Sequence, residues 1–425
     1  MPLPGRPRCG ISAMLGHDWR QSASPAFRLM IATSWLAPDS WKEKQEKEIL
    51  EASGEGLDWT EYLFLVDRHR IPALSWAAIG RVPDLAVPDG VRQELKRRSD
   101  DCRMRAIQHS LLLAQVLKRL NRDGIPVMPC KGPVLSFNLY GDVGLRQFRD
   151  LDVAVAESDL EQARASLEDL GWRVGEGNYR LSPRQWDSFL RNEYEMVFEH
   201  PQTNCILELQ WSNQWETPEV TRARWARSTP SEWQGCSIRE MNSGDLMLYL
   251  CSHGGHHAWF RAKWLGDVAR AHAMGLADWD AAFHEARKDH RERVLEVGLA
   301  LLEQLYGLPA PEPPPNPRIR MPALLVEIPF KALRDTKVPT FRTDLGFLRY
   351  RLRMSRYERM LSPRKPWRRS LGELFHFRED FRTVPLPDWL FWLYRPLRPF
   401  LWLLRLVRQA WQKPPNPSEN GDERI

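Results

Sequence analysis

The chain has 425 residues, of which 43% are hydrophobic, so it is long and apolar enough to bury the cores of two or three globular domains. Its formal net charge of +6 favours anionic partners such as nucleotides, nucleic acid or an acidic membrane surface, but charge alone selects none of them. The six cysteines include no C-x-x-C pair, which argues against a zinc site and a disulfide framework and favours reduced thiols in a cytoplasmic protein.

Helices are predicted to follow an N-terminal tail. Residues 1–40 are expected to be a disordered tail, because the first 29 residues lack the apolar run of a secretory signal, and Met30 is an alternative candidate for the first residue. Residues 41–123 are predicted to form a helical N-terminal region, since apolar residues recur at helical spacing with a break near Pro72. Gly124 suits the C-cap of the last of these helices.

The pattern changes from helical to strand-like at residue 124, and residues 124–215 are predicted to form a core of their own. Apolar and polar residues alternate in two late segments, as in a β-hairpin. The sequence therefore predicts an α+β fold, with a small mixed β-sheet flanked by helical N- and C-terminal regions. The expected strands are residues 125–129, 151–155, 194–200 and 205–211, and the expected helices are 133–140 and 158–170.

Three regions are expected after this core. Residues 216–308 are predicted to be helical and to pack on the core, 309–322 to be a proline-rich linker, and 323–425 to be a basic, aromatic-rich region. Within the last region, four arginines and two prolines between residues 389 and 411 argue against a helix that spans a bilayer. One hypothesis is a helix at 388–412 that lies on an anionic membrane surface, and the other is a helix docked on the protein's own core or on a partner.

Three carboxylates stand where neighbouring strands would bring them together. Asp150 and Asp152 point to the same side of a predicted strand, while Leu151 and Val153 point into a core. Two-metal nucleotidyl transfer needs two carboxylates that bridge metal ions roughly 4 Å apart, and a third for the metal that activates the acceptor hydroxyl. We predict that Asp150, Asp152 and Glu208 are catalytic and bind Mg²⁺ or Mn²⁺. Two solvated acids at a strand edge are the alternative reading of Asp150 and Asp152 alone.

Lys131, Gly132 and Arg146 are predicted to hold the phosphates of a nucleoside triphosphate (NTP). Lys131 and Gly132 fall between a strand and a helix whose first turn can accept Pro133. Gly132 would let backbone N–H groups approach a phosphate, and the helix N-terminus and Lys131 supply positive charge. Arg146 would clamp a phosphate with two hydrogen bonds, or else lie in solvent.

His253, His256 and His257 share one face of a predicted helix, a spacing that can bind zinc. No glutamate completes an H-E-x-x-H motif and no cysteine pair completes a site, so helix packing or substrate contact is the preferred interpretation. Trp264 and Asp267 are predicted to be a core residue and a salt-bridge or hydrogen-bonding residue.

These segments form a recognisable set: Lys131-Gly132, then residues 139–146, 150–153, 206–211 and 248–257, the last continuing through 263–267. Together they resemble the uncharacterised nucleotidyltransferase family within the DNA polymerase β-like nucleotidyltransferase superfamily. The likeness extends over roughly residues 45–305.

The resemblance implies that residues 124–215 are a compact nucleotidyltransferase core, with Asp150 and Asp152 as metal ligands and a phosphate loop at Gly132. Family members are often encoded in bacteria beside genes for surface polysaccharide production, which implies a role there. The chain departs from the pattern at two positions. Pro133 follows Gly132 where the superfamily has a second glycine or a serine, and Gln210 stands where the family commonly has a histidine.

The first functional hypothesis is a Mg²⁺-dependent nucleotidyltransferase that moves a nucleoside monophosphate from an NTP to an unidentified hydroxyl acceptor. The second is a non-catalytic nucleotide-binding or membrane-surface scaffold protein. A toxin-like enzyme that modifies tRNA or a protein ranks below both, because no basic aromatic nucleic-acid module is evident near the core. The expected location is cytoplasmic, either free or peripheral at the membrane.

Overall fold

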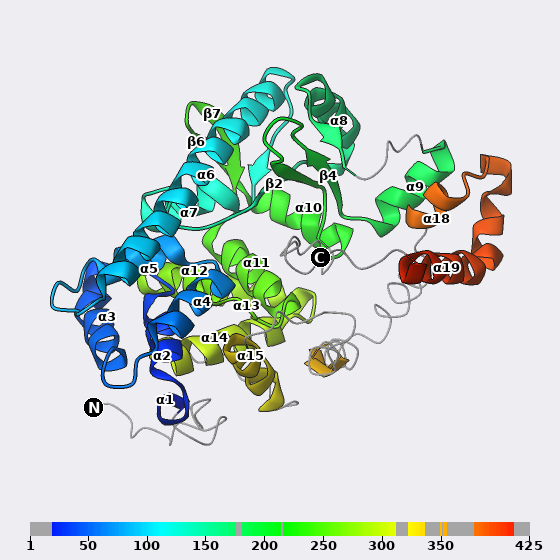
Figure 1. Ribbon diagram of the computed structural model, residues 1–425. Coiled ribbons are helices and arrows are strands. Elements are labelled where there is room, and N and C mark those ends of the chain that lie inside the picture. Colours follow the sequence, from blue (N-terminus) through cyan, green and yellow to red (C-terminus); the bar gives the residue numbers. More distant parts are fainter. Residues whose placement is uncertain are drawn as a thin grey trace, which may run out of the picture.

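The computed structural model is an α+β protein with one five-stranded mixed sheet among helices, which confirms the predicted fold class (Figure 1). The structure describes residues 19–175, 181–213, 216–311, 322–335, 349–350, 352–354 and 378–411. Two large hydrophobic cores lie in this part of the chain, one among helices and one against the sheet. The long helix α6 (Asp89–Arg122) joins them, because its Leu95 is buried in the first and its Leu117 in the second.

Residues 19–40 are folded, so the predicted disordered tail is wrong for this stretch. Helices α1 (Trp19–Ser22) and α2 (Pro25–Thr33) occupy this stretch, and the Ser24 side chain caps α2. Helix α2 is apolar and packs against other helices of the first core, which outweighs the polar composition around it. Met30 is buried inside α2, so a chain that began there would lack the first half of this helix. Residues 1–18 lie outside the described residues.

Three helices lead from α2 to α6. They are α3 (Asp39–Ala52), α4 (Trp59–His69) and α5 (Pro72–Ile79). Asp58 caps α4 by accepting hydrogen bonds from the backbone N–H groups of Thr60 and Glu61, and Arg70 ends it in the left-handed conformation at φ 57°.

The sheet has the strand order β1-β2-β5-β4-β3. Strands β2 and β5 are parallel, and the other neighbours are antiparallel, with β4 and β5 forming the predicted hairpin. The parallel register sets Asp152 opposite Glu208. The strands are β1 (Met128–Pro129), β2 (Asp150–Ala154), β3 (Arg173–Val174), β4 (Glu195–Glu199) and β5 (Ile206–Gln210).

The two central strands bury one face and carry polar residues on the other. Leu151 and Val153 of β2, with Leu207 and Leu209 of β5, are fully buried in the second core. Helix α6 and helix α8 (Leu160–Asp169), which follows the short 3₁₀-helix η2 (Glu157–Asp159), complete that core. Because side chains alternate along a strand, the residues between these leucines and valines lie on the opposite face. Helix α7 (Gly132–Tyr140) connects β1 to β2.

Residues 216–308, predicted to be helical, also contain a hairpin that was not predicted from the sequence. Strands β6 (Thr229–Trp233) and β7 (Cys236–Glu240) pair with each other, and the Arg239 N–H donates to the Val127 carbonyl at 2.8 Å. Trp233 and Ile238 are buried in the second core, a long-range contact that no local pattern reveals. The helices of this part of the chain are α10 (Pro218–Arg227), α11 (Ser243–His256), α12 (Ala262–Ala273), α13 (Trp279–Lys288) and α14 (Glu292–Tyr306); helix α9 (Pro183–Asn192) precedes them, between β3 and β4.

Helix α15 (Leu324–Arg334) packs on α14 and buries Leu325 and Leu333 in the first core. The proline-rich segment before it therefore does not separate α15 from that core; residues 312–321 of the segment lie outside the described residues. Elements α18 (Arg378–Thr383), η3 (Asp388–Leu393) and α19 (Tyr394–Trp411) form a small cluster, in which η3 packs on α9. Among the described residues, no helix is long and apolar enough to cross a membrane.

His69, at the end of α4, links three segments of the first core. It is fully buried; its Nδ1 accepts a hydrogen bond from the Ala262 N–H at 3.0 Å, and its Nε2 lies 3.1 Å from the Leu333 carbonyl. Because Nδ1 must accept, Nε2 carries the proton and donates, and the neutral ring uses both nitrogens. Burial, and then the charge of Arg68, lower the pKa of His69 well below its ordinary value.

We expect the free energy of unfolding to decrease as the pH falls below about 6.5, because the unfolded chain then protonates His69 and the folded chain does not. The contribution approaches about 1.4 kcal/mol per pH unit until the lowered pKa of the folded state is reached. Urea unfolding of the wild type and His69→Gln between about pH 5 and 8 measures it. Glutamine keeps a donor and an acceptor but takes up no proton, so its profile should be shallower. Equal slopes would contradict this assignment.

Candidate active site

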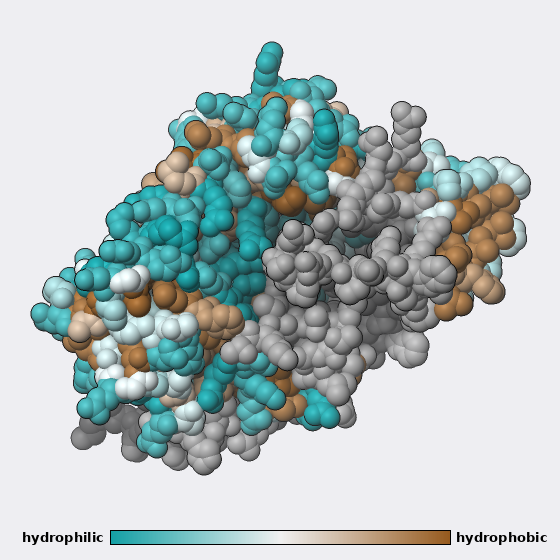
Figure 2. Space-filling model, viewed as in Figure 1, coloured by the Kyte–Doolittle hydropathy of each residue, from teal (hydrophilic) through white to brown (hydrophobic). Residues whose placement is uncertain are grey.

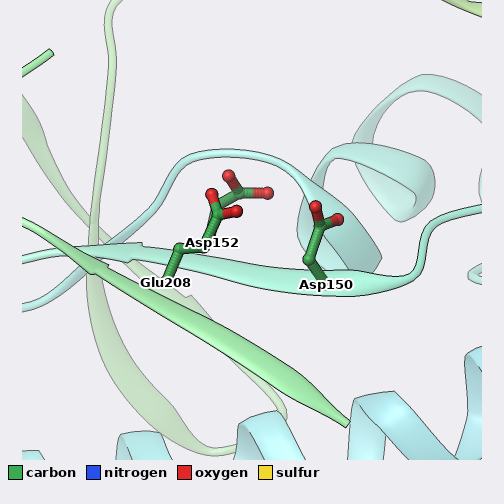
Figure 3. Close-up of side chains that lie close together, drawn as sticks. All are labelled: Asp150, Asp152 and Glu208. Atoms are coloured by element: carbon green, nitrogen blue, oxygen red, sulfur yellow. The ribbon is translucent and has the colours of Figure 1, made fainter. Parts of the chain in front are cut away.

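The polar face of β2 and β5 brings the three predicted carboxylates together (Figure 3). One oxygen from each of Asp150, Asp152 and Glu208 lies within 4.8 Å of the other two. The parallel pairing sets Glu208 beside Asp152, and Asp150 stands two residues earlier on β2. Asp152 is only 3% exposed, and the other two are partly buried. Negative charges held this close, away from water, need a cation or a proton among them.

Lys131 supplies one positive charge. Its ammonium lies 2.8 Å from Asp152 Oδ1, and the two side chains are 11% and 1% exposed. Burial lowers the pKa of Lys131, but Asp152 and other acidic neighbours outweigh burial and raise that pKa well above its ordinary value. The ammonium is therefore charged and serves as a counter-ion inside the acidic cluster.

Gly132 turns the chain from β1 into α7 beside this pair. Its φ of +65° lies in the left-handed region that favours glycine. The preceding Cys130 N–H donates to the Asp152 carbonyl at 3.0 Å, which fixes the turn against β2. The predicted Lys-Gly turn thus lies next to the carboxylates.

The surroundings of Glu208 favour its neutral form. Burial, then Glu195, then Asp152 and Asp150 raise the pKa of Glu208 well above its ordinary value. Gln210 Nε2 donates to Asp152 Oδ1 at 3.2 Å and to Glu208 Oε2 at 3.3 Å. Gln210, one of the two residues that depart from the expected pattern, therefore links the two carboxylates.

The surroundings of Asp150 have the opposite effect. Burial alone raises the pKa of Asp150, but Lys131, Lys263 and Arg70 lower it below its ordinary value. Lys263, on α12, is buried and donates to the Gln147 carbonyl at 3.1 Å, just before β2. Burial, and then Arg146 and Arg70, lower the pKa of Lys263 well below its ordinary value. The sequence assigned no role to Lys263 or Arg70, because nothing local to either residue shows that it faces Asp150.

Arg146, which was predicted to hold a phosphate, is buried in an ion pair with Asp267. It is 3% exposed, and its Nε lies 2.8 Å from Asp267 Oδ2. Tyr140 Oη donates to the other oxygen of Asp267 at 3.5 Å. Asp267 is therefore the salt-bridge residue that was predicted, and Arg146 ties the loop before β2 to α12. Its guanidinium is held by a carboxylate and does not lie in solvent.

The histidines on α11 pack beside the site. His257 stacks on Trp264, with ring centroids 5.0 Å apart, and His253 meets the same ring edge-on at 5.2 Å. Burial, and then the charge of Lys131, lower the pKa of His253 well below its ordinary value, so His253 lies near Lys131. In the described part of the chain, no histidine belongs to a cluster with the geometry of a metal site.

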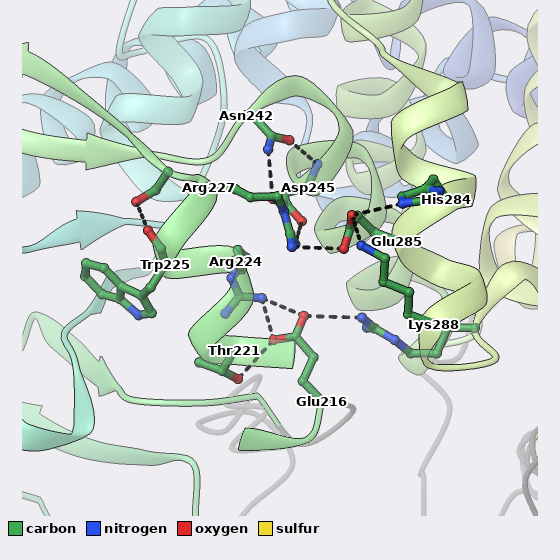
Figure 4. A network of polar contacts seen from close by, with 12 residues as sticks. Glu216, Thr221, Arg224, Trp225, Arg227, Asn242, Asp245, His284, Glu285 and Lys288 are labelled. Carbon is green, nitrogen blue, oxygen red and sulfur yellow. Dashed lines mark hydrogen bonds and ion pairs between the residues drawn. The ribbon is translucent and has the colours of Figure 1, made fainter. Parts of the chain in front are cut away.

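A polar network links α10, α11 and α13 (Figure 4). Arg227 lies 2.7 Å from Asp245, at the start of α11, and 2.9 Å from Glu285 on α13. Arg224 lies over the ring of Tyr249, 5.9 Å from its centroid. The network thus fixes the helix that carries Tyr249 and His253 next to Lys131.

Carboxylates on adjacent parallel strands, beside a lysine–glycine turn in a mixed sheet, agree with the predicted class of nucleotidyl-transferring enzymes. Residues 55–307 match the model of a family described as uncharacterised nucleotidyltransferase. This match covers more than half of the chain and all six predicted site residues, and the chain belongs to that family. It is therefore a nucleotidyltransferase, as the resemblance implied.

One solved structure with similarity to this chain is that of the antibiotic-resistance factor ANT(2'')-Ia. The two share 16% sequence identity, and the match covers 45% of this chain and 96% of that chain with a TM-score of 0.33. No curated protein matches the chain.

We expect Lys131→Met to lower the free energy of unfolding by about 3–5 kcal/mol, because it leaves Asp152 buried without its ammonium partner. Adding Asp152→Asn should restore part of this loss, since neither charge then remains. Urea unfolding in EDTA of both single variants and the double variant should give a coupling energy of about 1 kcal/mol or more.

The matched control is the exposed pair Lys96–Asp100 on α6, whose charged atoms are 2.6 Å apart and whose side chains are 59% and 56% exposed. Its coupling energy should stay below about 0.5 kcal/mol, because water screens it. Additive effects at Lys131 and Asp152 would show that their ion pair does not stabilise the fold.

Proposed function

We propose that this enzyme is a Mg²⁺-dependent nucleotidyltransferase that moves a nucleoside monophosphate from an NTP to a hydroxyl group. The observation that supports this proposal is the cluster of Asp150, Asp152 and Glu208 beside the turn at Lys131 and Gly132. In the reaction, the acceptor oxygen bonds to the α-phosphorus, the bond from that phosphorus to the bridging oxygen breaks, pyrophosphate leaves and the hydroxyl proton is released.

The donor set fits a hard divalent cation. All three groups are carboxylates, which Mg²⁺ and Mn²⁺ prefer over nitrogen and sulfur ligands. Burial, and then the neighbouring carboxylates, raise the pKa of Glu208, and a bound cation would favour its charged form. Asp150 and Asp152 would hold the metal ions, and Glu208 would complete the site on the acceptor side. Bound Mg²⁺ would stabilise negative charge on the attacking and leaving oxygens.

The phosphates would bind to Lys131 and to the backbone N–H groups at Gly132, where α7 begins and its dipole is positive. Lys263 would add positive charge beside Asp150 in its protonated form, which its lowered pKa disfavours until anionic phosphates bind nearby. Arg146 would reach a phosphate only by leaving Asp267, so we assign it the role of positioning the loop before β2.

The first class of acceptor to test is a sugar hydroxyl of a glycan precursor, because the resemblance links this family to genes for surface polysaccharide production. Treating the labelled product with nuclease, protease or glycosidase separates this class from tRNA and protein acceptors.

The test is transfer of label from each α-³²P-labelled NTP by the purified protein with Mg²⁺, in a lysate of the source organism. We expect transfer by the wild type and a loss of at least about a hundredfold in Asp150→Asn and Asp152→Asn, because each removes a metal ligand. Asp100→Asn, which changes an exposed carboxylate on α6, should transfer like the wild type. EDTA should abolish transfer.

Unchanged transfer in the Asp150→Asn and Asp152→Asn variants would overturn this site assignment. Tight NTP binding by the wild type without label transfer to any component would favour a non-catalytic nucleotide-binding protein instead.

A further inference from the structure

An exposed apolar patch covers the outer side of η3 and α19, far along the chain from the carboxylates. Figure 2 shows it as a brown area at the end of the molecule where Figure 1 labels α19. Large apolar side chains seldom gather on the surface of a monomer unless they contact another molecule or a membrane. The η3–α19 patch consists of Trp389, Trp392, Phe400, Leu403 and Leu404, whose exposed fractions are 72%, 62%, 66%, 56% and 49%.

The spacing of these residues places them on shared helix faces. Trp389 and Trp392 are three residues apart on a 3₁₀-helix, which has three residues per turn. Phe400, Leu403 and Leu404 have the i, i+3, i+4 spacing of one α-helical face. The exposed side chains therefore form continuous helix faces and are not scattered singly.

The inner side of the same segment is docked on the protein. Tyr394 and Leu401 are buried in a small core of their own. Tyr394 Oη donates to the Val384 carbonyl at 2.7 Å and accepts from Gln185 Nε2, on α9, at 3.1 Å. The Arg184 side chain donates to the Asp388 carbonyl at 3.3 Å. One side of the segment is thus docked on α9, and the side that carries the patch is exposed.

The charge of the segment indicates what would cover the patch. Residues 389–411 contain four arginines and no lysine, aspartate or glutamate. Arg395, at the start of α19, is exposed, and Arg398 lies 3.5 Å from Asp380. A second copy docked face to face would bring the exposed Arg395 of both copies together, which is unfavourable. An anionic lipid surface instead offers phosphates to Arg395 and an apolar layer to the rings.

We propose that the η3–α19 patch docks the enzyme on an anionic membrane surface. Helix α19 would lie along the surface with Phe400, Leu403 and Leu404 below the lipid headgroups. The two tryptophans would sit at headgroup level, where the apolar ring is buried and the indole N–H stays hydrated. This docking is independent of nucleotidyl transfer.

Vesicle flotation of the purified full chain tests the proposal, with phosphatidylcholine and phosphatidylglycerol at about 7:3 against phosphatidylcholine alone. The wild type should bind the anionic vesicles at least about tenfold more strongly than the neutral ones. Trp392→Ser/Phe400→Ser should weaken binding to anionic vesicles by at least about tenfold, because it removes two inserted side chains. Arg395→Gln should reduce the preference for anionic over neutral vesicles.

The control is Phe64→Ser/Leu111→Ser, which changes two exposed apolar residues on α4 and α6 and should bind like the wild type. Circular dichroism checks that each variant is folded. The proposal is overturned if the wild type does not float with anionic vesicles, or if the patch variant floats equally well. Self-association of the wild type that the patch variant loses, without vesicle binding, would assign the patch to a second copy instead.

Discussion

Three carboxylates gathered on one face of a small sheet impose the constraint on which the rest of the structure depends. The parallel pairing of β2 with β5 brings Asp152 and Glu208 together, and the backbone cannot relieve their repulsion. The positive charges must come from elsewhere. Lys131 comes from the turn after β1, Lys263 from α12 and Arg70 from the end of α4. The helices around the sheet therefore complete the charge balance of the site as well as covering it.

The basic residues around the carboxylate cluster come from segments that lie far apart in the sequence. Helix α4 ends at Arg70, and the adjacent His69 is hydrogen-bonded to the first residue of α12, one residue before Lys263. The same contacts that bury the first core thus set two of the cations that act on Asp150. The family match at residues 55–307 begins before α4 and ends after α14, and so includes every segment that contributes to this balance.

The sequence predicted the features that local patterns specify. Alternation along β2, β4 and β5 gave the sheet and the face of the carboxylates, and the Lys-Gly pair gave the turn. Features that depend on distant contacts were missed. Helix α2 is apolar but was included in the predicted tail, and it packs on helices distant in the sequence; β7 packs on α6. Arg146 was predicted to hold a phosphate; its ion pair with Asp267 on α12 is a distant contact that local spacing does not reveal.

The ion pair between Lys131 and Asp152 has a further consequence for the proposed reaction. A divalent cation that arrived alone would take Asp152 from Lys131 and leave a buried ammonium without a partner. A nucleotide that arrived alone would take Lys131 to its phosphates and leave Asp152 uncompensated. If the two arrived together, the carboxylate could hold the metal and the ammonium could hold a phosphate, so each buried charge would keep an opposite charge. On the proposed function, the charge balance of the site would therefore favour the metal–nucleotide complex over either component alone.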